Sequence, residues 1–288
     1  LSSGYTVRFD LGDAPGTAPE SQPVPNGGTA TRPTTDPTWE GHTFAGWYNV
    51  NEPWDFKTVV TGNMTLTAKW ITNPTVTVTG GTADPAAAAL TYGTGGPLTA
   101  SVSPAGQNYT YQWSCNGNAI SGATGTSYTI PADTAVGSYT YSCTVTAKIS
   151  GSDASASATS SDVTVTVSAK DYDSSFTISD IPDQTYTGSQ ITPEPEVKFG
   201  TTTLVKDRDY DLSYGTNINV GTNAGSVTIN FKGNYSGSAT VNFTIVKASQ
   251  TAPGENEGYT INYAAETITV ESDYEVYTEQ SDGTQITS

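Results

Sequence analysis

Short alternations of apolar and polar residues recur along the chain, as in "TVTVTG" at residues 75–80 and "VTVTVS" at residues 163–168. A period of two places every second side chain on the same face of an extended strand, so these segments predict half-buried β-strands. No window of about 11 to 18 residues has a convincing apolar period of 3.6, the spacing of an amphipathic helix. The pattern therefore predicts a mainly β chain.

Proline, glycine and polar residues interrupt this pattern at three places: "WITNPTVTV" at residues 70–78, "VSAKDYDSSF" at 167–176 and "VKASQTAPGENEGYT" at 246–260. These interruptions predict tandem modules with boundaries at residues 1–71, 72–169, 170–248 and 249–288. The first three pieces are long enough for a small core. The fourth holds two or three strands and is either a cap or the start of a further repeat, and its independent folding is left open.

Composition narrows the class of protein. The 288 residues include 28 Asp and Glu against 11 Lys and Arg, a net charge of −17, which opposes binding to nucleic acid or to anionic membranes. No segment approaches the roughly 18 apolar residues of a membrane span, so we expect no membrane insertion of this segment. The first residues lack the pattern of a signal peptide, so we expect an excised or processed piece of a longer protein.

Aromatic residues concentrate in "GHTFAGWYNVNEPWDF" at residues 41–56, which also contains the only histidine, His42. In an extended segment Phe44 and Tyr48 share one face with Gly46, and Trp47 lies on the other face. The aromatic side chains are expected to supply the buried area of a small module.

Several motifs of the first module resemble the Listeria–Bacteroides repeat, the B-repeat of internalin-type surface proteins. They are "YTVRFD" near the start, "GG" at residues 27–28, "EGHTFAGWY" ending at residue 48, "WDF" at 54–56 and "VTGNMTLTAKW" ending at residue 70. The resemblance covers nearly all of residues 4–70. It implies a ubiquitin-like β-grasp module, with one short helix near residues 34–39, that serves as a stalk or adhesive unit on a bacterial surface.

On this basis Phe44, Trp47 and Trp54 are predicted to be core residues. Trp39, which follows Pro37 in "DPTWEG", is predicted to be more exposed and is a candidate for stacking on a glycan.

The second piece resembles an immunoglobulin-type sandwich over roughly residues 74–168, because a strand tryptophan, Trp113, is followed by Tyr141-Ser-Cys143. The resemblance implies that Tyr141 is the tyrosine corner. The first cysteine, Cys115, follows the tryptophan instead of preceding it. If the two strands are neighbours, Cys115 and Cys143 can form a disulfide within one sheet, and a pair of free buried thiols is the alternative. Two cysteines in a Thr- and Ser-rich chain fit an oxidising exterior.

The third piece resembles a small β-sandwich module of Gram-positive surface proteins, over about residues 176–247. The motifs are "YTG" at 186–188, "DYDLSYG" at 209–215 and "GNYSG" at 233–237. Tyrosines at the ends of this sandwich, Tyr235 in particular, are second candidates for ligand binding.

Residues for catalysis are sparse. A triad would need His42, and neither a Gly-x-Ser-x-Gly elbow nor a Cys/His cluster with metal-ligand spacing is present. Glu194 and Glu196 share a face, but the prolines that alternate with them suit the solvated edge of a sheet. The alternating Asp207, Asp209 and Asp211 are the one candidate calcium site, with a charged hairpin edge as the alternative. No cofactor and no enzymatic activity are expected.

The sequence therefore predicts an extracellular, non-catalytic segment of a bacterial cell-surface protein, built from adhesive or spacer modules. Its partner would be a host or matrix protein or a glycan. An array of carbohydrate-binding modules and an accessory region of a larger surface enzyme are the alternatives.

Overall fold

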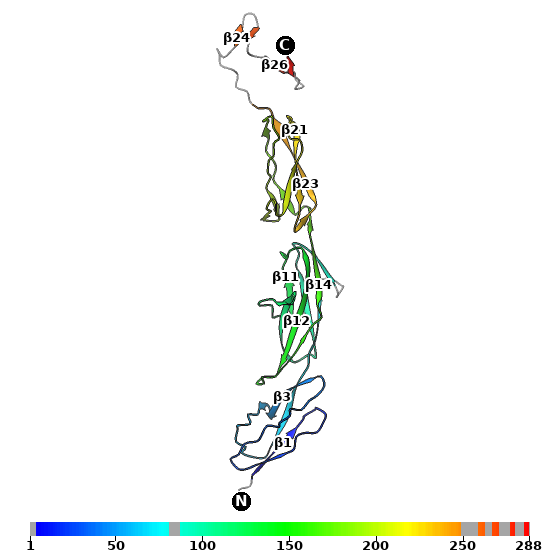
Figure 1. The fold of residues 1–288 in the computed structure, drawn as a ribbon, viewed down its shortest axis with the longest axis vertical. Coiled ribbons are helices and arrows are strands. Elements are labelled where there is room, and N and C mark those ends of the chain that lie inside the picture. Colours follow the sequence, from blue (N-terminus) through cyan, green and yellow to red (C-terminus); the bar gives the residue numbers. More distant parts are fainter. Residues whose placement is uncertain are drawn as a thin grey trace. The chain divides into compact units, whose positions relative to one another are not determined.

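The computed structural model of the chain describes residues 4–80 and 87–248, together with 259–262, 267–270, 277–279 and 285–287. Within these residues the regular structure is β-strand (Figure 1), which confirms the predicted mainly β class. The described residues contain no helix long and apolar enough to cross a bilayer. Two compact units are present: Leu1–Thr177 with Lys198–Asp211 and Ile229–Ala239, and Ile178–Val197 with Leu212–Thr228 and Thr240–Ser288. The division into four modules stays a prediction.

The first five strands form one sheet in the order β2-β1-β5-β3-β4, coloured blue to cyan in Figure 1. Strands β1 and β5 are parallel, and the other neighbours are antiparallel. The bounds are β1 Tyr5–Asp10, β2 Gln22–Val24, β3 His42–Asn49, β4 Glu52–Pro53 and β5 Met64–Thr72.

One face of this sheet carries the core, as the alternation predicts. Val7 on β1 and Leu66 on β5 are fully buried, while Arg8 between the core positions of β1 is exposed. Trp47 is 2% exposed, and Phe44 and Trp54 pack against the same cluster. The core prediction is therefore confirmed for Trp47, whereas Phe44 and Trp54 are only partly buried at the edge of the cluster.

A β-bulge corrects the predicted faces of β3. Phe44 lies opposite Trp70 and Gly46 lies opposite Lys69, so Ala45 is an extra residue in the strand. After the bulge the alternation is shifted by one, and Phe44 and Trp47 meet on the same side with ring centroids 5.5 Å apart. Gly46 has φ +122, a backbone conformation that residues with a side chain rarely adopt, which accounts for glycine at this position.

The short helix expected near residues 34–39 is absent from the described residues 4–80, where this segment consists of bends and loop. Prolines explain the difference. Pro37 disfavours helical backbone at Asp36 and cannot donate a backbone hydrogen bond. The side chain of Asp36 instead accepts hydrogen bonds from Arg32, 2.8 and 2.9 Å long.

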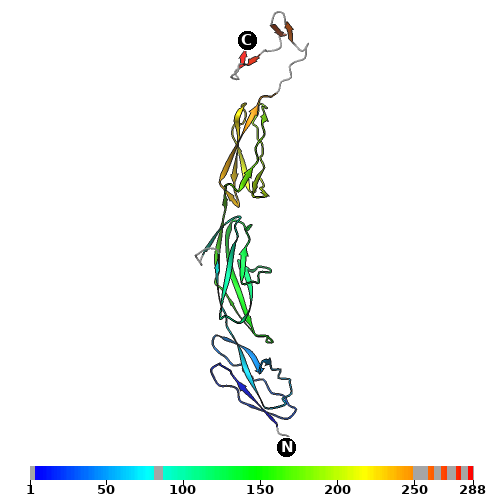
Figure 2. The same cartoon turned by 180° about the vertical axis from the view of Figure 1, so that it is seen from behind.

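Residues 75–80 and 87–168 form two sheets around a shared core. The smaller has the order β11-β8-β6, and the larger has the order β10-β9-β12-β14-β7, with β13 paired to β12. Leu98 and Ile130 from the smaller sheet pack with Trp113 and Val165 from the larger, and all four are at most 1% exposed. The bounds are β6 Thr75–Gly80, β7 Ala87–Thr91, β8 Gly96–Ser103, β9 Asn108–Cys115, β10 Asn118–Ala119, β11 Ser127–Ile130, β12 Gly137–Lys148, β13 Ser155–Thr159 and β14 Val163–Ser168. Figure 2 shows these strands, coloured cyan to green, from behind. A two-sheet sandwich is therefore present, and its assignment to the immunoglobulin type stays a prediction.

The strands after residue 169 form a four-stranded sheet in the order β17-β23-β21-β20, a three-stranded sheet in the order β16-β18-β19, and a parallel pair of β15 and β22. In the second unit, Val227, Phe243 and Ile245 make the buried core. The bounds are β15 Lys170–Asp171, β16 Phe176–Ile178, β17 Gln184–Thr185, β18 Val197–Phe199, β19 Thr202–Thr203, β20 Tyr210–Tyr214, β21 Gly221–Phe231, β22 Tyr235–Ser236 and β23 Ser238–Val246.

Of the predicted piece 249–288, the structure describes four strands: β24 Tyr259–Asn262, β25 Thr267–Val270, β26 Tyr277–Glu279 and β27 Gln285–Thr287. They pair as β24 with β25 and β26 with β27, both antiparallel. The rest of this piece lies outside the described residues.

Candidate functional site

Trp39, the first predicted ligand contact, is half-buried and packs against its own module. Its ring stacks on the imidazole of His42, with centroids 3.6 Å apart and an interplanar angle of 10°. Its edge meets Trp70 at a centroid distance of 5.7 Å. The backbone N–H of His42 donates to the Trp39 carbonyl over 3.0 Å, which holds the two rings together. One face of the indole is therefore already covered.

Tyr235, the second predicted ligand contact, is buried, contrary to the prediction. It is 5% exposed and meets Tyr92, Phe176 and Phe199 at centroid distances of 5.3, 5.6 and 5.6 Å. Burial raises the pKa of Tyr235, and the neighbouring Tyr92 adds to the rise. The motif "GNYSG" does not indicate burial because the covering rings come from β16, β18 and the segment after β7.

Asp207, Asp209 and Asp211 do not converge on a metal site. Asp209 is buried and accepts hydrogen bonds from the Arg208 guanidinium at 2.8 and 3.0 Å and from the Val205 N–H at 2.7 Å. Burial alone would raise the pKa of Asp209, but these hydrogen bonds outweigh it and the pKa lies below its ordinary value. Asp211 pairs with Lys232 at 2.6 Å. Among the described residues no three His, Cys, Asp or Glu side chains form a group that could hold a metal ion.

Cys115 and Cys143 are free thiols, so the predicted disulfide is not formed. Strands β9 and β12 are neighbours as the prediction required, but the register pairs Cys115 with Tyr141 and Cys143 with Trp113. The cysteines are therefore diagonal on one face, where Cα atoms lie about 7–8 Å apart, beyond the usual span of a disulfide. Burial raises the pKa of the Cys143 thiol.

The hydrogen bond expected of a tyrosine corner is made by a neighbouring residue. Tyr139 donates its hydroxyl proton to the carbonyl of Ala135 over 3.0 Å. Tyr141, which the resemblance assigned to this role, is buried beside Cys115, and its pKa is raised by burial and by the hydrogen bond with that thiol.

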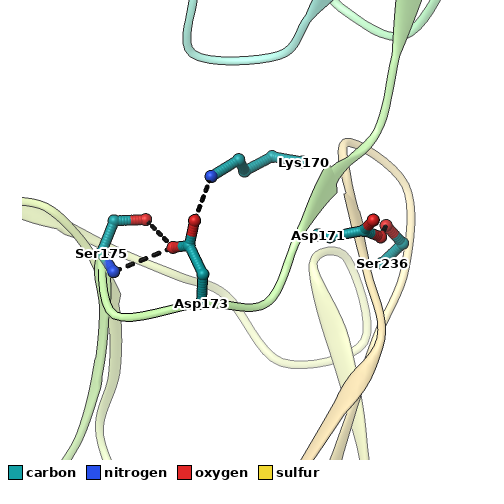
Figure 3. Close-up of polar contacts among 5 residues, drawn as sticks. All are labelled: Lys170, Asp171, Asp173, Ser175 and Ser236. Atoms are coloured by element: carbon teal, nitrogen blue, oxygen red, sulfur yellow. Dashed lines mark hydrogen bonds and ion pairs between the residues drawn. The ribbon is translucent and has the colours of Figure 1, made fainter.

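The loop after β15 has a polar network that the sequence suggested only as a linker (Figure 3). Asp173 accepts hydrogen bonds from the Lys170 ammonium and from the hydroxyl and N–H of Ser175, and Asp171 accepts one from Ser236. The ammonium of Lys170 and the two donors of Ser175 lower the pKa of Asp173 to about 2.

A cavity of about 370 Å³ adjoins the core of the first sheet, and we name it the Trp54 cavity. Its aromatic lining is Phe44, Trp47, Trp54 and Phe56. Its polar lining comes from Arg32 and Asp36 on one loop and from Ser152 and Asp153 on the loop between β12 and β13. All of these residues belong to the first compact unit.

The loop that supplies Ser152 is held against β3. The hydroxyl of Ser152 donates to the Ala45 carbonyl over 2.7 Å and accepts the N–H of Ala154 over 3.1 Å. Beside it, Ala45, Ile71, Ala147 and Ala156 form a buried apolar cluster. Asp153 is exposed at the rim of the cavity.

A second concavity of about 650 Å³, the proline groove, is lined by Pro19, Pro23, Pro33 and Pro37 together with polar residues. Arg32 and Asp36 line both the proline groove and the Trp54 cavity. Their side chains are 56% and 48% exposed, so the pair adds little to stability.

Sequence reasoning missed both concavities. "RPTTDP" at residues 32–37 contains the ion pair but reads as a proline-rich loop, and Asp153 lies about 100 residues from Trp54 in the chain. The aromatic residues of segment 41–56 were the one available signal.

Part of this chain is similar to known proteins. Residues 5–69 match the model of the Listeria-Bacteroides repeat domain, which confirms that part of the resemblance. Two proteins of Evansella cellulosilytica, named as a Gly-rich membrane protein and as a membrane protein, are each 42% identical over 73 residues. The match covers 24% of this chain and 8% and 10% of the respective relatives, so the chain spans a small part of their length. The first sheet and its aromatic core are thus those of a segment similar to a Listeria-Bacteroides repeat.

Proposed function

We propose that the chain is a non-catalytic segment of a bacterial cell-surface protein and that its modules act as spacers or adhesive units. The repeat match at residues 5–69 and the relatives named as membrane proteins support a cell-envelope role. The activity of the whole parent protein, including any catalytic domain, is a separate question because the chain spans so little of its relatives.

The packing of β5 against β12, β13 and the residue before β9 carries the spacer proposal. Only Asn73 and Pro74 separate β5 from β6. The side chain of Gln107 donates to the Thr72 carbonyl over 3.0 Å, and Ile71 packs with Ala147 and Ala156. A short connection with a buried apolar contact restricts motion more than a polar linker does.

Two measurements test this function. Brief proteinase K treatment of intact cells that produce the parent protein should release peptides of this chain, and release only after lysis would contradict a surface location. Ala156→Asp should place an unpaired charge in the apolar cluster and split the calorimetric transition of residues 5–168 in two. Ser155→Asp, at an exposed position of the same strand, is the control, and equal behaviour of the two variants would argue against a coupled spacer.

A further inference from the structure

We propose that the Trp54 cavity binds a neutral saccharide. The proposal rests on the proposed function in one respect, because a surface location would expose the cavity to glycans.

The size and lining of the cavity suit a small ligand. Ligand sites commonly have volumes of about 300–1,000 Å³ and combine aromatic walls with a few polar groups. The Trp54 cavity has about 370 Å³ and four aromatic side chains. The apolar C–H face of a sugar ring can lie on such side chains.

Two of those aromatic side chains have unused hydrogen-bond donors. The indole Nε1 atoms of Trp47 and Trp54 are buried and donate to no acceptor in the part of the chain that the structure describes. Other indoles of the chain do find acceptors: Trp70 donates to the Leu11 carbonyl at 3.0 Å and Trp113 to the Gly125 carbonyl at 2.9 Å. A buried donor without an acceptor is destabilising. Both Nε1 atoms are shielded from solvent in the unliganded chain, so a ligand oxygen accepts from Trp54 only after a neighbouring side chain of the cavity moves aside.

The rim supplies hydrogen-bonding groups of both kinds. Arg32 offers N–H donors, and the carboxylates of Asp36 and Asp153 accept. A planar guanidinium or carboxylate has two hydrogen-bonding atoms side by side, so it can bond two adjacent hydroxyls of a sugar. Arg32 and Asp36 already bond each other before a ligand binds, so their side-chain rotamers are partly restricted in the unliganded chain.

The charge of the rim selects against other ligand classes. One guanidinium faces two carboxylates, in a chain with a net charge of −17, so phosphate, uronate and nucleic acid are disfavoured. An apolar peptide side chain would fill the aromatic part but leave the indole donors without an acceptor. A sugar hydroxyl both donates and accepts, so a neutral saccharide offers partners to Arg32, Asp36 and Asp153 of the lining.

The proline groove extends the prediction from one sugar to several. Arg32 and Asp36 line both concavities, so a chain of sugars bound beside Trp54 can continue past this pair. We therefore expect oligosaccharides to bind more tightly than the corresponding monosaccharide.

The experiment uses the full chain and an array of neutral gluco-, xylo- and manno-oligosaccharides, followed by calorimetric titration of the best binder. Trp54→Phe keeps an aromatic ring and removes the donor, and Arg32→Met keeps the aliphatic stem and removes the guanidinium. Trp39→Ala, outside the lining of both concavities, is the matched control. Circular dichroism and the thermal midpoint verify that each variant is folded.

We expect saturable binding of at least one neutral oligosaccharide, with Kd raised about tenfold, equivalent to 1.4 kcal/mol, by Trp54→Phe or Arg32→Met and unchanged by Trp39→Ala. Absence of saturable binding by the folded wild-type chain would overturn the proposal. Binding that both cavity variants retain would also overturn it, as would binding that only Trp39→Ala loses. Binding restricted to acidic glycans or to peptides on a parallel array would overturn it as well. The proteinase K measurement on intact cells reports on the proposed function independently of these results.

Discussion

The aromatic residues around Trp54 and those around Phe176 form two clusters with opposite character. Four aromatic rings surround Phe176, with centroids 4.9 to 5.6 Å from its own: those of Tyr172, Phe199, Phe231 and Tyr235. Around Trp54 the rings adjoin a cavity, and two indole donors have no protein acceptor. Aromatic density alone therefore does not indicate a binding surface, because what matters is whether ring faces and polar atoms are satisfied within the fold.

The largest expected effect comes from opening the cluster around Phe176. Phe176 is 7% exposed and contacts four other rings. Phe176→Ala should lower the free energy of unfolding by about 3–5 kcal/mol, since it removes buried area and leaves a cavity. Urea unfolding followed by tyrosine fluorescence or circular dichroism measures this. Tyr186→Ala, at a 41% exposed site, is the control. A loss in Phe176→Ala no greater than in this control would show that the cluster is not tightly packed.

A smaller loss of stability distinguishes a buried polar atom that has a hydrogen-bond partner from one that has none. Tyr235→Phe removes a buried hydroxyl that is hydrogen-bonded with Tyr92 and should cost about 1 kcal/mol of stability. Trp54→Phe removes a donor that has no protein partner and should lose less than its change in size alone predicts. Thermal unfolding of the two variants in the same buffer makes the comparison. A loss in Trp54→Phe larger than its lost volume accounts for would mean that the indole donor already has an acceptor.

The smallest effect concerns the exposed loop beside the Phe176 cluster. The pKa of Asp173 is about 2 in the folded chain, against an ordinary 3.8. A lowered folded pKa stabilises the protein above the unfolded pKa, and this contribution is lost as the pH falls from 3.8 to about 2. Asp173→Asn should therefore have a shallower decline of thermal midpoint between pH 5 and pH 2.5 than the wild type. The other 27 acidic residues are the same in both proteins, so the difference between the two slopes reports on Asp173 alone. Parallel slopes would show that the Lys170 and Ser175 contacts are not maintained in solution.

Some features of the fold follow from local pattern. The alternating residues of β6 and β14 and the core positions of Trp47 and Leu66 were predictable, because strand period and side-chain volume are local properties. Segment 41–56 also indicated the aromatic core of the repeat. In the same strand the bulge at Ala45 reversed the predicted face of Phe44, since a bulge depends on the pairing with β5 and leaves no mark in the period.

The candidate site shows the limit of such reasoning. Trp39 and Tyr235 were chosen as ligand contacts from their sequence neighbours. His42 covers one face of Trp39, which stays half-buried, and rings from distant strands bury Tyr235. The disulfide prediction was wrong because of the strand register. Cys143 lies opposite Trp113 and not opposite Cys115, so the two cysteines are diagonal neighbours, too far apart for a disulfide.

By itself, the sequence determined the mainly β class, the acidic character and the repeat at residues 5–69, because these depend on composition, strand period and contiguous motifs. Tertiary structure alone decided which aromatic residues are covered, which donors lack acceptors and which loops meet at the Trp54 cavity. Exposure and hydrogen bonding depend on contacts between residues far apart in the chain. The meeting of Trp54 with Asp153 exists only once β3 and the β12–β13 loop are packed together.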